Sequence, residues 1–393
     1  MSSWRSRILI LPVGTFVIGT DAFVVAGVLP SLTEELRVDA TAVGLLITLF
    51  AVTYAVASPV LGALTSQWER RRLLLVALAV FAVANLLAAI TPNYGFMLFA
   101  RVLAGIGAAM FTPAATGTAA MLVSAEVRGR ALALVGAGLT IATVIGVPLA
   151  TLVGNTVGFR AAFWAITAAS VVVAAVIAMR LPAVTMPGGT TLRQRLDIAR
   201  LPGVLSTLAV STCAFVGGFT VYNYIAPLFD DQLGADPRSI TLLLLAFGVG
   251  GAIGNFVGGS VADRIGAFRT VLTGLVLASG GLLLIALVGD TWAGAVVSIM
   301  LWGVGGWMQV PAQQARLVAL AGPAGPLAIS LNASAMYLGI GLAGAVGGLV
   351  IGTAGLGWLA PFGASMGALG LVITLVFYPR AERRAAAAAT DKA

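Results

Sequence analysis

The stretch PSLTEELRVD at Pro30–Asp39 recurs in altered form as PLFDDQLGAD at Pro227–Asp236, 197 residues further along the chain. GALTSQWERRRLLL from Gly62 matches GSVADRIGAFRTVL from Gly259 at the same offset. A third block repeats at 198 residues, where Gly105, Gly107, Met110 and Pro113 match Gly303, Gly305, Met308 and Pro311. Three widely spaced blocks at nearly one offset predict a structural unit that occurs twice.

The segments around these blocks are too apolar for a water-soluble chain. Of the 393 residues, 60% are hydrophobic and 9% are charged, and the mean hydropathy is +1.04. A soluble domain carries about 25% charged residues. Apolar runs of about 20 residues, each long enough to cross a hydrocarbon core of about 30 Å, follow one another along the whole sequence. The composition therefore predicts a polytopic membrane protein.

Glycine, proline and charged residues divide the apolar runs into twelve predicted spans, which indicates an all-α membrane protein with two pseudo-symmetric six-helix bundles. The spans are expected at residues 8–30, 41–64, 73–91, 94–119, 130–154, 160–180, 203–228, 239–260, 267–288, 292–315, 328–353 and 357–379. Residues 1–180 then form the first bundle, 181–202 a cytoplasmic linker, 203–380 the second bundle and 381–393 a cytoplasmic tail.

The distribution of basic residues predicts the orientation. Threaded through twelve spans, 18 of the 22 basic residues fall in segments on the side of the termini. The opposite side holds only Arg37, Arg160 and Arg238, and Arg101 lies inside a span. Because loops rich in arginine and lysine stay in the cytoplasm, both termini are expected there. The first apolar run carries Asp21 in its middle and lacks a signal-peptide cleavage site, so we interpret it as a retained span.

The same composition argues against several functions. The formal charge of +8 sits in short clusters between spans rather than on a basic face, which does not favour nucleic-acid binding. The chain has no histidine and one cysteine, Cys213, so we expect no metal site and no intramolecular disulfide. No phosphate-binding loop is visible, and no cofactor is expected. Clustered nucleophiles or bases are also missing, so we expect no enzyme.

Several motifs resemble the major facilitator superfamily over essentially the whole chain. They are RVLAGIGAA from Arg101, GSVADRIGAFR from Gly259, GTDAFVVAGVLP from Gly19 and GVPLATLVGNTVGFRAAFW from Gly146. Within the superfamily they are similar to the twelve-span drug:proton antiporters, and are nearest to bacterial exporters of purine nucleosides, sugars and chloramphenicol. The resemblance implies a transporter of the bacterial inner membrane, a monomer, which takes protons and a small-molecule substrate as partners.

The resemblance also implies a cytoplasmic latch. Asp263 and Arg264 match the loop signature of the family, whose acid pairs with the start of a helix in the other half, here near Arg128 and Arg130. The alternative is ordinary positive-inside topology with a solvated aspartate. The first-half loop departs from the family pattern, because Ser66 and Glu69 stand where the signature carries an acid and a glycine.

Asp21 and Arg101 are the charged side chains predicted to lie well inside the membrane. At about 1.5 Å per residue, their distances from the span ends place them at similar depth. A charge at mid-bilayer costs about 2.5–3.5 kcal/mol, so such residues are candidates for function. Burial favours the neutral acid and a nearby guanidinium favours the carboxylate, a balance suited to loading and releasing one proton per cycle. The alternative is a structural ion pair between the first and fourth spans.

Polar and aromatic residues that interrupt the spans are the candidates for substrate contact. They are Tyr54, Phe111, Asn155, Tyr222, Asn223, Tyr224, Asn255, Trp302, Gln309, Asn332 and Tyr337. Each is also explained by helix packing. A mostly apolar cavity with few polar anchors suits amphipathic organic solutes. Gly146 and Pro148 are expected to form a hinge in the fifth span.

The sequence thus predicts a proton-coupled exporter of small organic molecules that works by alternating access. Two other functions stay open. One is a facilitator or importer of the same fold, in which Asp21 binds a cationic substrate. The other is a membrane sensor that does not transport.

Overall fold

The computed structural model describes residues 8–124, 127–185 and 191–390. Over these residues the chain is almost entirely helical, and twelve helical segments are long and apolar enough to cross a membrane. The all-α fold and the twelve predicted spans are therefore confirmed. The elements are α2 (Ile10–Gly27), α3 (Leu29–Leu36), α4 (Ala40–Leu64), α5 (Arg70–Ala89), α6 (Tyr94–Met121), α7 (Arg128–Ile141), η2 (Ala142–Gly146), α8 (Val147–Val157), α9 (Phe159–Arg180), α10 (Leu192–Asp197), η3 (Ile198–Arg200), α11 (Val204–Tyr222), α12 (Ile225–Leu233), α13 (Pro237–Ile265), α14 (Ala267–Val288), α15 (Trp292–Ala321), η4 (Gly322–Ala324), α16 (Gly325–Ala354), η5 (Leu356–Trp358) and α17 (Leu359–Thr390).

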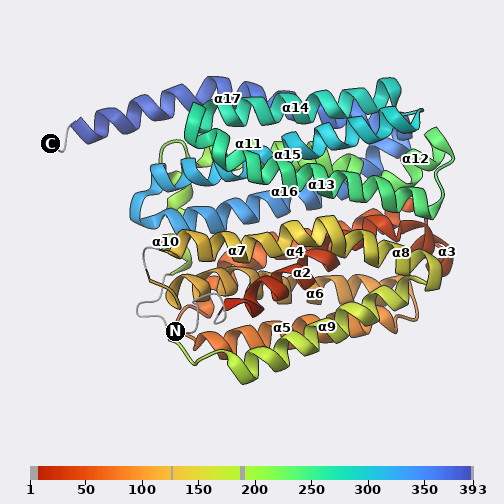
Figure 1. Ribbon diagram of the computed structural model, residues 1–393, viewed down its shortest axis with the longest axis horizontal. Helices are drawn as coiled ribbons and strands as arrows, with labels where there is room; N and C mark the ends of the chain where they lie inside the picture. The colour runs from red at the N-terminus through yellow and green to blue at the C-terminus, as the bar shows by residue number, and fades with distance from the viewer. Residues whose placement is uncertain (1–7, 125–126, 186–190, 391–393) are drawn as a thin grey trace.

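The long helices run side by side along one direction (Figure 1). Helices α2 to α9 lie in the lower part of that view, and α11 to α17 lie in the upper part. The short helices α3 and α12 sit together at one end of the molecule, while α10 and the last turns of α17 lie at the other end (Figure 1). We name these two ends the α3–α12 end and the α10 end.

The first and seventh predicted spans, 8–30 and 203–228, extend too far at their C-terminal ends. Helix α2 stops at Gly27 and α3 begins at Leu29, while α11 stops at Tyr222 and α12 begins at Ile225. Pro30 lies in the first turn of α3, where the missing N–H of proline costs nothing. Proline therefore restarts a helix here, and a reading of hydropathy alone runs across the break.

The two breaks follow the repeat of the sequence. Both short helices end on a left-handed residue, Arg37 at φ 54° and Gly234 at φ 59°, which are 197 positions apart. Two residues later, the Asp39 and Asp236 carboxylates cap the next helix, accepting hydrogen bonds from the backbone N–H of Ala42 (2.7 Å) and of Ser239 (2.8 Å). Hydrogen bonds from the Ser239 side chain, and then from its backbone N–H, lower the pKa of Asp236.

The structure adds a helix to the predicted linker and lengthens two helices of the second half. The predicted linker, 181–202, contains α10, whose Thr191 and Gln194 form a capping box. Helix α17 continues to Thr390 rather than ending near 379. Helix α15 extends to Ala321 rather than 315, so that Arg316 lies inside the helix, buried, with its guanidinium 3.5 Å from the centre of the Tyr378 ring.

Helices α4 and α16 join the two halves of the chain along a line of small residues near the α3–α12 end. The Thr48 hydroxyl donates to the Gly341 carbonyl (2.8 Å) across this contact. A Cβ at Gly344 would lie 2.6 Å from the Gly44 carbonyl oxygen, so only glycine permits the observed approach. We call this contact the α4–α16 seam.

A second crossing joins α13 to the fifth span. A Cβ at Gly248 would overlap the carbonyl of Thr143, and the Asn255 amide donates to the Thr140 hydroxyl (3.0 Å). The fifth span contains the π-helical turn η2, which ends at Gly146 just before Pro148. Proline removes a backbone donor and crowds the carbonyl four residues earlier, which explains the irregular turn.

Overpacking the α4–α16 seam is expected to open it. Gly344→Leu places a side chain against α4, whereas Gly352→Leu, two turns along the same helix, adds one where no heavy atom lies within 4 Å. A Cβ at Gly348 lies 3.4 Å from the Thr41 Cβ, close to the separation of about 3.5–4.5 Å in a disulfide. In a Cys213→Ala background, the pair Thr41→Cys and Gly348→Cys should therefore cross-link.

Gly344→Leu should slow that cross-linking by about tenfold or more, since overpacking costs about 1–3 kcal/mol. Gly352→Leu should leave the rate within about twofold. Equal rates in the two leucine variants would contradict the close contact at the seam.

Candidate functional site

Asp21 on α2 and Arg101 on α6 form an ion pair inside the first half. Arg101 Nη1 lies 2.8 Å from Asp21 Oδ1, and the exposed fractions of the two side chains are 1% and 0%. Arg101 Nη2 also lies 3.4 Å from the backbone carbonyl of Asp21. The sequence placed the two residues at similar depth, and the structure brings them into contact.

The pair is incompletely satisfied. Within the described residues, Asp21 Oδ2 and Arg101 Nε are buried and have no hydrogen-bond partner. A buried carboxylate oxygen without a donor is costly, because it has lost its hydration and gained nothing in return. A proton, a water molecule or a polar group of a ligand bound at Oδ2 would remove that cost.

Aromatic rings enclose the guanidinium. Arg101 Cζ lies 4.5 Å from the centre of the Phe50 ring and 6.0 Å from that of Phe163. A cation over a ring face is stabilised by about 2 kcal/mol when water is excluded. Sequence reasoning missed both phenylalanines, because an aromatic residue in an apolar span resembles any other core residue.

Two predicted substrate residues meet across the halves of the chain. The rings of Tyr54 on α4 and Tyr337 on α16 are stacked, with centres 3.8 Å apart and planes at 25°. Tyr337 also lies 6.3 Å from the Phe50 ring, measured between centres. The contact therefore links the surroundings of the ion pair to the second half.

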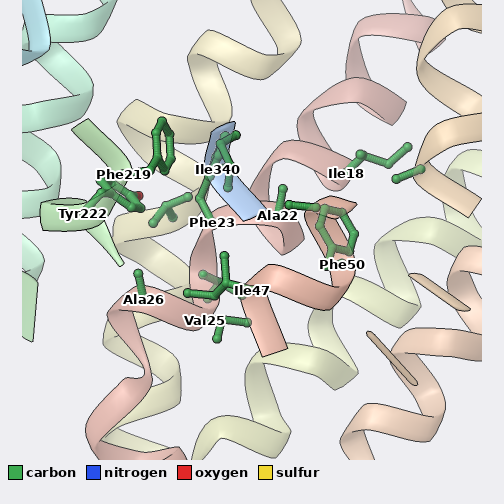
Figure 2. Packing of buried hydrophobic residues seen from close by; sticks show 14 of the residues in the cluster. Ile18, Ala22, Phe23, Val25, Ala26, Ile47, Phe50, Phe219, Tyr222 and Ile340 are labelled. Atoms are coloured by element: carbon green, nitrogen blue, oxygen red, sulfur yellow. The ribbon is translucent and has the colours of Figure 1, made fainter. Parts of the chain in front are cut away.

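A larger aromatic cluster begins two residues after Asp21. The Phe23 ring lies 5.4 Å from Phe219 and 6.0 Å from Tyr222, both on α11 (Figure 2). Tyr222 continues to Phe247 at 5.0 Å, and Phe247 to Trp302 at 4.5 Å. The cluster thus contains residues of α2, α11, α13 and α15. It brings together two of the predicted substrate residues, Tyr222 and Trp302.

Other candidates serve packing contacts in the observed arrangement. The Tyr224 hydroxyl donates to the Gly344 carbonyl (2.6 Å) beside the α4–α16 seam. The Asn155 amide donates to the Gly27 carbonyl (2.9 Å), at the break between α2 and α3. The Phe111 ring fills the space beside Gly14.

Three polar candidates of the second half are almost fully buried. The Ser211 hydroxyl donates to the Asn332 side-chain carbonyl (2.7 Å). The amide nitrogen of Asn223 and the amide oxygen of Gln309 have no hydrogen-bond partner within the described residues. These two orphaned groups are available to water or to a ligand.

The predicted latch residues lie at the end of α13 (Asp263, Arg264) and at the start of α7 (Arg128, Arg130). Asp263, Arg264 and Arg130 are exposed, and none of them forms an ion pair with another described side chain. Arg128 begins α7, but its side chain lies outside the described part of the chain.

The unusual first-half loop has its own interactions at the α10 end. Glu69 caps α5, accepting hydrogen bonds from the backbone N–H of Arg71 (2.7 Å) and of Arg72 (3.3 Å). Arg195 of α10 donates to the Gly62 carbonyl (3.0 Å). Burial, and then the nearby charge of Arg70, lower the pKa of Arg195. An arginine of the linker therefore ties α10 to the end of α4.

Removing either partner of the ion pair should destabilise the protein. The loss of stability should depend on pH when Arg101 is removed and not when Asp21 is removed. Asp21→Asn leaves a guanidinium that stays charged, and an unpaired buried charge costs about 3–5 kcal/mol. Arg101→Leu leaves a carboxyl that becomes neutral by taking up a proton. The thermal unfolding temperature of Arg101→Leu, relative to that of the native chain, should therefore rise as the pH is lowered from about 8 to about 5.

Asp21→Asn should show no such rise. Arg160→Leu is the control, since it breaks the partly exposed Arg160–Glu35 ion pair and should change the unfolding temperature little. The same pH dependence in Asp21→Asn and Arg101→Leu would contradict the observed pairing.

Comparisons with known proteins agree with this architecture. The family model described as Major Facilitator Superfamily matches residues 12–207 and again 207–393. The chain is 34% identical to the inner membrane transport protein YdhP of Escherichia coli over 94% of this chain and 95% of that protein. It is 30% identical to the uncharacterized MFS-type transporter YbcL of Bacillus subtilis over 95% of each.

A solved structure shares the fold. It is the bacterial homologue of the human lysosomal transporter Spinster, in an inward-facing and unoccupied conformation. The TM-score is 0.70 at 17% sequence identity, over 97% of this chain and 96% of the other.

Proposed function

The chain belongs to the major facilitator superfamily, and from this premise we propose that it is a proton-coupled antiporter that exports small organic molecules from a bacterial cytoplasm. Membership makes it a multi-pass membrane transporter of small molecules that works by alternating access. The coupling to protons and the direction of transport are the proposal.

The observation that carries the proposal is the buried Asp21–Arg101 pair with its unpartnered Oδ2. Arg101 keeps its charge, so Asp21 is the member of the pair that changes protonation. Oδ2 offers a proton a site that costs no existing hydrogen bond. No other acidic side chain lies at this depth in the described spans, which supports one proton per cycle.

The charge of the pair favours certain substrates. With Asp21 ionised, the pair is neutral overall, and with Asp21 protonated it carries one positive charge. A proton from outside would therefore expel a cation and would retain an anion. Antiport at this site suits uncharged or cationic molecules, and the aromatic rings of Phe23, Tyr54, Tyr222 and Tyr337 suit apolar rings.

The contacts also support a cycle in which the two bundles, 1–180 and 203–380, rock against each other. We infer that the α10 end is cytoplasmic, with both termini, and that the state described here is closed at the α3–α12 end by the α4–α16 seam. Asp263 and Arg264 would engage the start of α7, at Arg128 and Arg130, when the α10 end closes. The π-helical turn before Gly146 and Pro148 would serve as the hinge.

Inside-out vesicles with an acidic interior test the proposal. Nucleosides, chloramphenicol-like drugs and sugars would be added singly, and proton release from the vesicles followed. We expect at least one class of compound to release protons from vesicles that hold the native chain and none to do so with Asp21→Asn. Asp290→Asn, which removes an exposed acid in a turn, should behave as the native chain does.

The other outcomes separate the alternatives. Release that survives Asp21→Asn would move the proton site elsewhere. Uptake of a labelled compound without proton movement would favour a facilitator. Binding with neither uptake nor proton release would favour a sensor.

A further inference from the structure

We propose that Phe50 is a positioning residue that sets the pH at which Asp21 takes up its proton, by holding the Arg101 guanidinium against the face of its ring. This proposal rests on the proposed function, in which Asp21 is the proton site. It concerns a residue that neither the sequence motifs nor the ion pair itself identifies.

The geometry places Phe50 on the guanidinium directly. Its ring centre lies 4.5 Å from Arg101 Cζ, and its side chain is 1% exposed. Phe163, the other ring near the guanidinium, is 6.0 Å away. A Cβ at Gly105, one turn after Arg101 on α6, would lie 2.7 Å from the Phe50 carbonyl oxygen. Helices α4 and α6 therefore meet closely beside this contact, which fixes the ring relative to the guanidinium.

The two protonation states of Asp21 use this ring differently. When Asp21 is ionised, the carboxylate at 2.8 Å compensates most of the charge of Arg101. When Asp21 is protonated, the guanidinium keeps its charge and loses that partner. The Phe50 face is then the nearest aromatic surface that can stabilise the cation. The ring therefore favours the protonated state over the ionised one.

Few other charges act on Asp21. The titratable groups that face it from neighbouring helices are Arg101 on α6, Tyr337 on α16 and, next to Tyr337, Tyr54 on α4. The other described helices packed against α2 carry their charges near their ends, at Glu34 and Glu35 on α3, Arg130 on α7, Arg160 and Arg180 on α9, Asp230 and Asp231 on α12, and Arg238, Asp263 and Arg264 on α13. The protonation of Asp21 therefore depends mainly on Arg101 and the groups in contact with this pair.

Phe50 also belongs to the helix that meets the second half. Its ring lies 6.3 Å from Tyr337, and α4 continues into the α4–α16 seam at Thr48. A rocking motion that opens the seam changes the contacts of α4, and with them the position of the Phe50 ring. Proton affinity then depends on conformation, and by reciprocity protonation biases the conformation.

The test measures the protonation of Asp21 without any substrate. Full-length purified protein would be titrated while infrared difference spectroscopy follows the carboxylic acid C=O band that disappears in Asp21→Asn. Phe50→Met keeps the apolar bulk and removes the ring. We expect the pH at which Asp21 is half protonated to be lower by about 0.5–1.5 units in this variant. This shift corresponds to the free energy of a cation–π interaction that is lost only from the protonated state.

Two variants separate this effect from a general loss of packing. Phe50→Tyr keeps the ring and should restore the native midpoint to within about 0.3 units. Phe81→Met removes a fully buried ring on α5, whose Cβ lies beside Gly107 of α6, and should leave the midpoint in place. Each variant would be compared as a monodisperse folded sample.

An unmoved midpoint in Phe50→Met, or an equal shift in Phe81→Met, would overturn the role of Phe50 and would leave Asp21 as the proposed proton site. If no carboxylic acid C=O band of the native protein is lost in Asp21→Asn, the proposed proton site is overturned, and the role of Phe50 with it.

Discussion

The buried ion pair between Asp21 and Arg101 is the constraint around which the first half is arranged. Two charges in an apolar helical bundle are tolerated only when each is close to the other and to groups that replace water. Here the guanidinium has one carboxylate oxygen, one backbone carbonyl and an aromatic face. The carboxylate has one oxygen satisfied and one unsatisfied. That imbalance is costly for a permanent structural pair, and useful for a group that binds a proton.

The helices that surround the pair connect it to the junction of the two halves. Helix α4 contributes Phe50 to the guanidinium, Tyr54 to the stack with Tyr337, and Gly44 to the α4–α16 seam. Glycine lets the seam close without interlocking side chains, so that closure depends on many weak contacts and a few hydrogen bonds to carbonyls. Such a contact can form and open repeatedly, as alternating access requires. One helix thus contacts the ion pair, the aromatic residues and the junction.

The sequence predicted the parts of this arrangement that leave a chemical or periodic signal. Asp21 and Arg101 stood out because charges are rare in apolar spans, and the repeat stood out because its blocks keep one offset. The helix breaks at Val28 and Asn223 were missed, since proline can restart a helix without interrupting an apolar run. Phe50 was missed because its role depends on which helix face meets α6, and hydropathy carries no such information. Tyr224 was a candidate for substrate contact from sequence, and the structure adds that its hydroxyl donates to a backbone carbonyl beside the seam.

If Asp21 carries the transported proton, the number of protons that the purified protein binds must depend on its carboxyl group. Unbuffered, purified protein would be titrated between about pH 5 and pH 9, and the protons bound per chain compared for the native protein and Asp21→Asn. We expect the native chain to bind one proton more than the variant over this range. Identical titration curves would contradict the role of Asp21 as the proton site, because its carboxyl group would then keep one protonation state throughout.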